Sequence, residues 1–137
     1  MSVDSITSLF AYLGMPLANQ RWSWGASNAN CVVLRVWQDE RVRGQNAIVI
    51  RRELPSLMDR KGYKERDSHI QEIEAGKPCY LIMCLAVNPL SEPREIKSFN
   101  KDYLFVCGEL VKIEEGVLAI TYESKVKISD FKKSMSA

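Results

Sequence analysis

The sequence predicts an α+β fold, a mainly antiparallel curved sheet or small barrel of five to six strands with two flanking helices. Three observations lead to this prediction. Apolar runs of strand length outnumber segments with helical periodicity, and the last three runs are joined by short turns. The chain of 137 residues also has the length of a single domain, so residues 1–137 are expected to form one folding unit.

Two segments carry the periodicity and end signals of helices. Asp4 or Ser5 can cap the first helix, and Gly14 ends it. Its apolar positions follow the spacing i, i+3, i+4 and i+7: Ile6, Leu9, Phe10 and Leu13. The second helix is expected over 67–75, because a possible cap precedes it and Gly76 followed by a proline ends it.

The strands are expected in the apolar runs, and polar or breaker-rich segments are expected between them. The predicted strands are 31–37, 47–50, 79–87, 103–107 continuing through a bulge at Gly108 into 109–113, 117–122 and a short edge at 126–128. The run 31–37 is almost continuously apolar, which predicts a central strand covered on both faces. The irregular segments are expected to be a turn at 25–30, a flexible loop at 59–66, a loop at 89–100 and a frayed tail at 132–137.

Composition favours a cytoplasmic protein. No apolar run approaches the roughly 20 residues that span a bilayer, and the N-terminus lacks a basic region followed by an apolar one. We therefore predict no membrane partner. The four cysteines lie in apolar, strand-like runs without a CxxC pair, so we expect buried thiols, no metal site and no cofactor. They are Cys31, Cys79, Cys84 and Cys107.

Charge is distributed unevenly along the chain. The stretch from Arg21 to Arg66 holds ten basic and five acidic residues, a charge of +5 against −3 for the remainder of a chain with net charge +2. Such an asymmetry can mark a surface that faces phosphate, and it can equally be a solvated face. The sequence leaves both readings open.

The segment Arg-Trp-Ser-Trp-Gly at 21–25 is the main candidate for a ligand-binding surface. In an extended chain Trp22 and Trp24 point to the same side, where they can pack in the core or stack on a flat ligand. Arginine side chains that can grip phosphate surround them in sequence. The candidate ligand-binding residues are Arg21, Trp22, Trp24, Arg35, Arg51 and Arg52.

Catalytic arrangements are not evident, and no catalytic residue is predicted. His69 shares a helix side with Glu72, which suits a general base as well as an ordinary surface helix. Ser23 lacks the glycine that precedes the serine of a nucleophile elbow, and phosphate-binding glycine loops are missing from the sequence. Whether the protein is an enzyme stays open, with a binding role favoured.

In its order of elements, the chain resembles the PUA-like group, which includes the EVE and ASCH modules. The resemblance covers about 21–122 and rests on the early tryptophan segment and on the helix–Gly–Pro–strand passage from Ile73 to Cys84. It implies binding of RNA or modified DNA bases in an aromatic-lined cleft. The Trp-Ser-Trp-Gly and Ile-Lys-Ser-Phe-Asn segments are also similar to small bacterial proteins, some of them encoded on mobile elements, and no functional residue is carried over from these.

These observations predict a small binding domain that contacts nucleic acid or a nucleotide-like ligand through tryptophan and arginine side chains. The alternatives are a small-molecule-binding protein, with a small aromatic ligand in an apolar cleft, and a protein-interaction module. The interaction module would act as an inhibitor, or as a homodimer formed through an exposed sheet edge.

Overall fold

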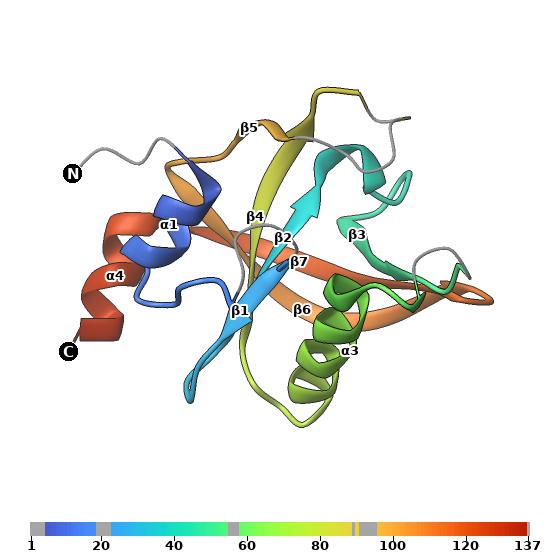
Figure 1. Ribbon diagram of the computed structural model, residues 1–137, viewed down its shortest axis with the longest axis horizontal. Helices are drawn as coiled ribbons and strands as arrows, with labels where there is room; N and C mark the ends of the chain where they lie inside the picture. Colours follow the sequence, from blue (N-terminus) through green and yellow to red (C-terminus); the bar gives the residue numbers. More distant parts are fainter. Residues whose placement is uncertain (1–4, 19–22, 55–57, 89, 91–95, 137) are drawn as a thin grey trace.

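The computed structural model describes residues 5–18, 23–54, 58–88, 90 and 96–136, which form an α+β fold around one curled, open sheet (Figure 1). The described strands are β1 (Gly25–Ser27), β2 (Val32–Trp37), β3 (Ala47–Arg52), β4 (Cys79–Ala86), β5 (Ile96–Phe99), β6 (Tyr103–Glu114) and β7 (Val117–Lys127). The described helices are α1 (Ile6–Tyr12), α3 (Lys61–Glu74), α4 (Ile128–Ser136) and the short 3-10 helix η1 (Gln38–Glu40). The predicted fold class is confirmed.

The strands are ordered β1-β2-β4-β6-β7-β3, with β5 pairing beside β4. Every described pair of strands is antiparallel except β2 with β4, which is parallel. A parallel pair needs a long crossover, and here the chain between the two strands contains β3 and α3. The predicted bulge near Gly108 is present as shifts of register between β6 and β7 on either side of Cys107.

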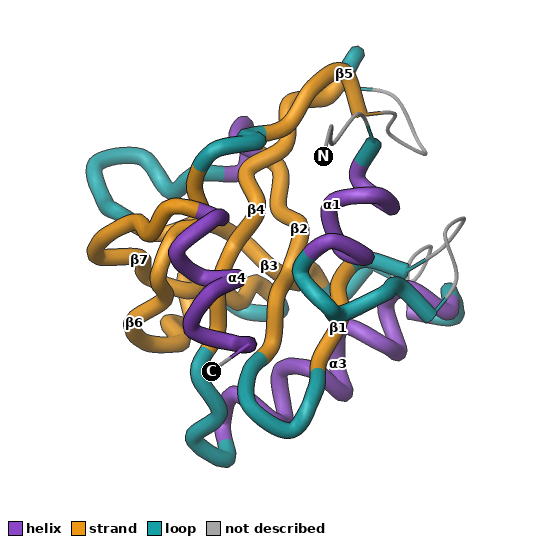
Figure 2. The backbone as a smooth tube through the Cα atoms, turned by 90° about the vertical axis from the view of Figure 1, so that its left-hand side faces the viewer, coloured by secondary structure: helices purple, strands orange, loops and turns teal. Residues whose placement is uncertain are grey.

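The sheet has a hydrophobic cluster on each face. On one face, α1 and α4 pack against the strands, and Figure 2 looks onto these two helices with the strands behind them. The fully buried Leu9 and Phe10 of α1 meet Phe131 of α4 in this cluster. On the other, concave face, Ile70 of α3 packs against buried side chains of β2, β3, β4 and β7. The strand β2 is therefore covered on both faces, as predicted.

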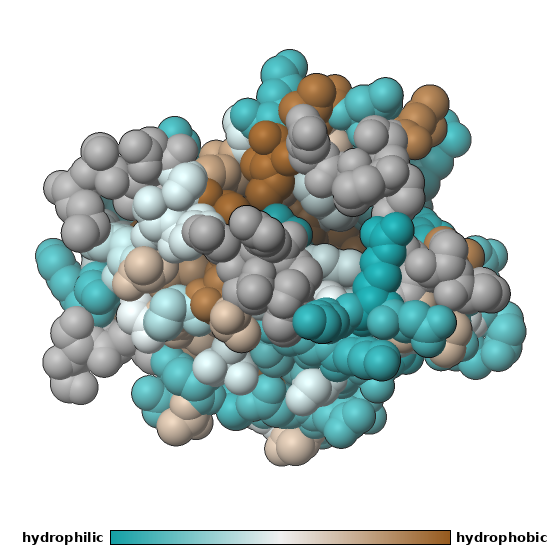
Figure 3. All heavy atoms as spheres, viewed as in Figure 1, coloured by the Kyte–Doolittle hydropathy of each residue, from teal (hydrophilic) through white to brown (hydrophobic). Residues whose placement is uncertain are grey.

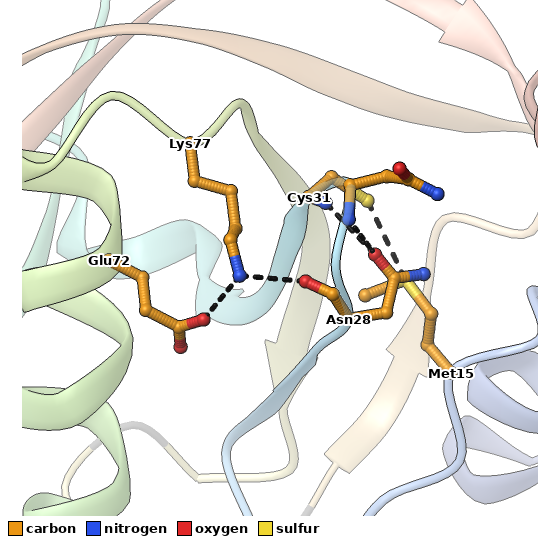
Figure 4. A network of polar contacts seen from close by, with 6 residues as sticks. Met15, Asn28, Cys31, Glu72 and Lys77 are labelled. Atoms are coloured by element: carbon orange, nitrogen blue, oxygen red, sulfur yellow. Dashed lines mark hydrogen bonds and ion pairs between the residues drawn. The ribbon is translucent and has the colours of Figure 1, made fainter.

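The N-terminal helix and the turn before β2 follow the sequence closely. Ser5 caps α1 by accepting a hydrogen bond from the Ser8 amide at 3.0 Å. In the turn, the side-chain oxygen of Asn28 accepts the amide of Cys31 at 2.9 Å, and Lys77 Nζ donates to the Asn28 carbonyl at 2.7 Å and to Glu72 at 2.5 Å (Figure 4). This network joins the end of α3 to the β1–β2 turn.

Five segments differ from the sequence-based prediction. The stretch 59–66 is not a loop, because α3 already begins at Lys61. The turn predicted at 25–30 is shorter, since Gly25–Ser27 pairs with β2 as β1. The loop predicted at 89–100 contains β5, and the tail predicted to fray forms α4. The predicted edge at 126–128 continues β7 and begins α4.

The early start of α3 has a clear physical cause. Tyr63, Arg66 and Ile70 are all buried, and their spacing of three and four residues puts them on one helix face. The sequence pattern hides this face because the middle position is an arginine, which is almost never fully buried unless it is paired. Here the charged side chain faces the sheet and makes the contacts that hold the helix on it.

Arg66 is 4% exposed and donates hydrogen bonds to three main-chain carbonyls. Its two terminal nitrogens bind Ile50 O at 2.8 Å, Trp24 O at 2.9 Å and Arg35 O at 2.8 Å. One guanidinium thus connects β3, β2 and the segment that enters β1. Burial lowers the pKa of Arg66 to about 10, which still leaves the group charged at neutral pH.

Gly25 allows the close approach of β1 to β2. A Cβ atom at this position would lie 2.6 Å from the Val33 carbonyl oxygen and 3.2 Å from Leu34 Cα, and both are backbone atoms that cannot rotate away. Glycine is therefore needed where β1 meets β2, beside the carbonyls that Arg66 binds.

Replacing Arg66 with methionine is expected to destabilise the fold strongly. The change keeps an apolar stem and leaves three carbonyls without their donor, which should cost about 3 kcal/mol or more in the free energy of unfolding. Urea denaturation followed by circular dichroism measures this cost. Lys64→Met on the exposed side of the same helix is the control and should change stability by less than about 0.5 kcal/mol. Equal stability of the two variants would contradict the role assigned to Arg66.

Candidate functional site

Of the six residues predicted to bind a ligand, the structure brings Trp24 and Arg35 together. Trp24 precedes β1, and its carbonyl accepts the amide of Arg35 at 3.0 Å. The Trp24 ring is half-buried, and its centroid lies 5.8 Å from the guanidinium carbon of Arg66. Arg21 and Trp22 lie outside the described residues.

The segment around Trp24 is fixed by the carboxylate next to Arg66. Glu65 accepts the Ser23 hydroxyl at 2.8 Å and the Trp24 amide at 2.9 Å. Ser23 is 1% exposed. A buried hydroxyl that donates to a carboxylate holds the chain in place, and this is the role that the structure gives Ser23.

Arg35 is half-buried on β2, between two residues that face the concave core. Burial lowers the pKa of its guanidinium, and the nearby Cys84 and Glu65 oppose this effect. Of the arginines predicted to bind a ligand, Arg35 is one whose side chain makes no hydrogen bond or ion pair with the described residues.

Arg51 and Arg52 follow each other at the end of β3 and interact with different carboxylates. Arg51 forms ion pairs with Asp67 and, at 3.8 Å, with Glu53. Arg52 binds Glu40 through two nitrogens at 2.6 and 3.2 Å. A phosphate that approached either arginine would compete with an existing ion pair, which weakens the case for a phosphate-binding surface here.

The concave face holds a pocket of about 430 Å³, which is within the range of small-molecule sites. Hydrophobic residues gather on the upper part of the molecule in Figure 3, around β4 and β5, whereas the part around α3 is hydrophilic. The pocket is lined by Gln38, Arg41, Ile48, Met83, Leu85, Ser98, Phe99, Asn100, Phe105 and Tyr122.

The walls of the pocket are apolar and aromatic. Phe105 of β6 and Tyr122 of β7 form an edge-to-face pair with ring centroids 5.6 Å apart. Ile48 and Met83 reach the same space from β3 and β4. All four belong to, or pack against, the cluster that α3 covers further along the sheet. The pocket is thus the part of the concave interior that α3 leaves open.

Polar groups stand around these walls. Gln38, Ser98 and Asn100 supply amide and hydroxyl groups. Arg41 is exposed, donates to Asn46 Oδ1 at 3.2 Å and forms no ion pair with the described residues. Aromatic walls with a few hydrogen-bonding groups and one cation suit a flat, polar-edged ligand that carries a negative charge.

His69 lies inside the protein and not on the helix surface. It is 7% exposed, and its Nδ1 makes no hydrogen bond with the described residues. Glu72, the residue expected to orient it, instead accepts the Lys77 ammonium at 2.5 Å. Burial is the largest effect on the pKa of His69 and lowers it, assisted by Arg66 and Lys77 and opposed by Glu65 and Glu72.

Three of the cysteines are buried, as predicted, and Cys107 is partly exposed. Burial raises the pKa of Cys84 to about 12, so this thiol is protonated at neutral pH. Cys107 lies beside Cys79, and its pKa is raised first by their hydrogen bond and then by burial. A protonated thiol is a poor nucleophile, so neither Cys84 nor Cys107 is activated for catalysis.

The part of the chain that the structure describes contains no group of three His, Cys, Asp or Glu side chains arranged to hold a metal ion. None of its helices has the length and apolar character to cross a membrane.

Comparisons with family models, curated proteins and solved structures found no match to this chain. The resemblance to PUA-like modules therefore stays a prediction.

None of the pocket residues was among those predicted to bind a ligand, although the alternation of apolar residues along the strands points to some of them. Phe105 and Cys107 alternate with outward-facing positions on β6, as do Ile120 and Tyr122 on β7. This alternation predicts which side chains share a face, and it cannot show that the interior beneath them stays open. Arg41 and Asn100 lie in connections whose course depends on the tertiary fold.

Acidic pH is expected to destabilise the fold through His69. The folded-state pKa is depressed, so the stability from neutral His69 is complete above about pH 6.5, the ordinary value, and is lost as the pH falls through the folded-state pKa. Urea midpoints of the native protein and of His69→Gln, measured from pH 7.5 to pH 5, test this. The native protein should lose more stability than the variant. Parallel profiles would show that another group causes the dependence.

Proposed function

We propose that the protein is a binding domain for a nucleotide-like ligand, whose base enters the concave pocket between β3, β4, β6 and β7. The observation that carries the proposal is the lining of this pocket. Flat rings of Phe105 and Tyr122 line a space of about 430 Å³, and an arginine without an ion-pair partner among the described residues stands at its edge.

The chemistry of the lining matches that of a nucleotide. Aromatic side chains stack on any base, and each stacked base contributes roughly 1–3 kcal/mol. The Gln38 amide can pair with the polar edge of a base as both donor and acceptor. Asn100 Oδ1 already accepts the amides of Asp102 and Tyr103 at 2.9 Å, so Asn100 offers its NH2 group as a donor. The planar guanidinium of Arg41 can bind a phosphate with two parallel hydrogen bonds.

The proposed site lies away from the tryptophan segment at 21–25. The Trp24 amide donates to Glu65, and the Trp24 ring lies against the Arg66 guanidinium. Arg51 and Arg52 form ion pairs with carboxylates. Arg41 lies in the same basic stretch, from Arg21 to Arg66, and its charge is available to a ligand. No catalytic group is assigned to the pocket, and the proposed role is binding alone.

Calorimetric titration with the four nucleoside monophosphates and their nucleosides tests the proposal. Arg41→Gln should weaken binding of a monophosphate about tenfold or more, the loss expected for a charged hydrogen bond, and leave nucleoside binding nearly unchanged. Arg43→Gln is the matched control, because Arg43 is also exposed, lies two residues away and does not line the pocket.

Two results would contradict the proposal. Absence of binding of every nucleoside and monophosphate at millimolar concentration would remove the nucleotide-like ligand. Tight binding of neutral aromatic compounds, unaffected by Arg41→Gln, would support the small-molecule alternative instead.

A further inference from the structure

We infer that the ligand of the pocket is one unit of a longer phosphodiester chain, which leaves the pocket along lysines of β7 and the turn before β6. The inference rests on the proposed function and extends it from a nucleotide to single-stranded nucleic acid. It starts from three exposed lysines beside the pocket, Lys101, Lys125 and Lys127, which we call the lysine track.

The sheet register places Lys125 and Lys127 on the pocket side. Lys125 is paired with Phe105, which lines the pocket, and Lys127 with Tyr103. Residues directly opposite in an antiparallel pair share a face, as do residues two apart in one strand. All four side chains therefore lie on the face of the sheet that holds the pocket, and the two lysines follow each other along β7 about 7 Å apart.

Aromatic rings accompany these lysines. Lys125 Nζ lies 4.3 Å from the ring centroid of Tyr103. Lys101 follows Asn100, a pocket residue, and its Nζ lies 5.6 Å from the centroid of Phe99, another pocket residue. On the pocket face, Tyr103 and Lys125 thus continue from Phe105, while Lys101 stands beside the pocket at Asn100. Single-stranded nucleic acid is bound by this combination, because the cations meet the phosphates and the rings stack on the bases.

The lysine track forms no ion pairs within the described structure, whereas Lys77 and Lys112 each bind a glutamate. The exposed Asp102 and Glu123 are near in sequence and make no ion pair with the track. Unpaired cations on one face attract a polyanion, and the short spacing suits successive phosphates of one chain.

The test compares a mononucleotide with single-stranded octanucleotides of DNA and RNA of mixed sequence, using calorimetry for the first and fluorescence anisotropy for the others. The test variant is Lys101→Gln/Lys125→Gln/Lys127→Gln. The control variant, Lys61→Gln/Lys64→Gln/Lys133→Gln, removes the same charge from exposed lysines elsewhere. Circular dichroism verifies that both variants are folded.

The octanucleotide should bind the native protein at least tenfold more tightly than the mononucleotide. The test variant should lose this advantage and keep its mononucleotide affinity. The slope of log affinity against log salt should fall by roughly 0.7 for each phosphate contact removed, about 2 in total. The control variant should behave as the native protein. The better of the DNA and RNA probes identifies the natural chain.

Each failure has a separate meaning. The role of the lysine track would be overturned if the mononucleotide bound and the octanucleotide bound no more tightly. Equal losses of octanucleotide affinity in the test and control variants would overturn it as well. Neither result would contradict binding in the pocket. Lysine-dependent octanucleotide binding without any mononucleotide binding would overturn the pocket and leave a backbone-binding surface. Equally tight binding of inorganic polyphosphate would show that the track attracts any polyanion and would overturn the assignment to nucleic acid.

Discussion

The buried guanidinium of Arg66 is the contact on which the arrangement of the concave face depends. Three carbonyls, from the segment entering β1, from β2 and from β3, point at one side chain of α3. The strands β2 and β3 approach each other without being neighbours in the sheet. Arg66 connects them by donating hydrogen bonds to a carbonyl of each strand. An unpaired carbonyl in an apolar interior is costly, so the helix and the open sheet stabilise each other.

This arrangement divides the concave interior into two parts with different properties. Where α3 docks, Ile70 and its neighbours fill the space, and the polar contacts are satisfied by Glu65 and Arg66. Beyond the helix, the same strands present Phe105 and Tyr122 to an open pocket. A ligand that fills the pocket would cover the apolar side chains of this part of the concave interior, as α3 covers those of the other part. Binding and folding stability are therefore expected to be linked, since a ligand that binds only the folded state stabilises it.

The sequence predicted most of the fold because its apolar runs have clear periods and clear ends. The long run of β4 and the β6–β7 hairpin with its glycine turn are examples. The failures share one cause, which is that tertiary contacts overrule local pattern. The start of α3 depends on the buried Arg66, a charged residue of the kind that is common in loops. The strand β5 forms because part of β4 has an edge that is free to pair with it. The candidate site was harder to predict, since Arg41, Asn100 and Tyr122 are far apart in the chain and only the curl of the sheet brings them to one pocket.

The pairing of β3 with β7 affects the order in which the protein can fold during synthesis. The strand β3 ends at Arg52, and its partner β7 runs from Val117 to Lys127, so about half of the chain must follow before the pair can form. Until then, apolar residues of β3 such as Val49 lack their partners in β7 and remain available to other chains, a situation that promotes aggregation. A ribosome-bound chain that ends before Val117 would thus present an unsatisfied strand. Completion of the sheet, together with the α4 helix that follows β7, is possible only after Ser136 has been synthesised.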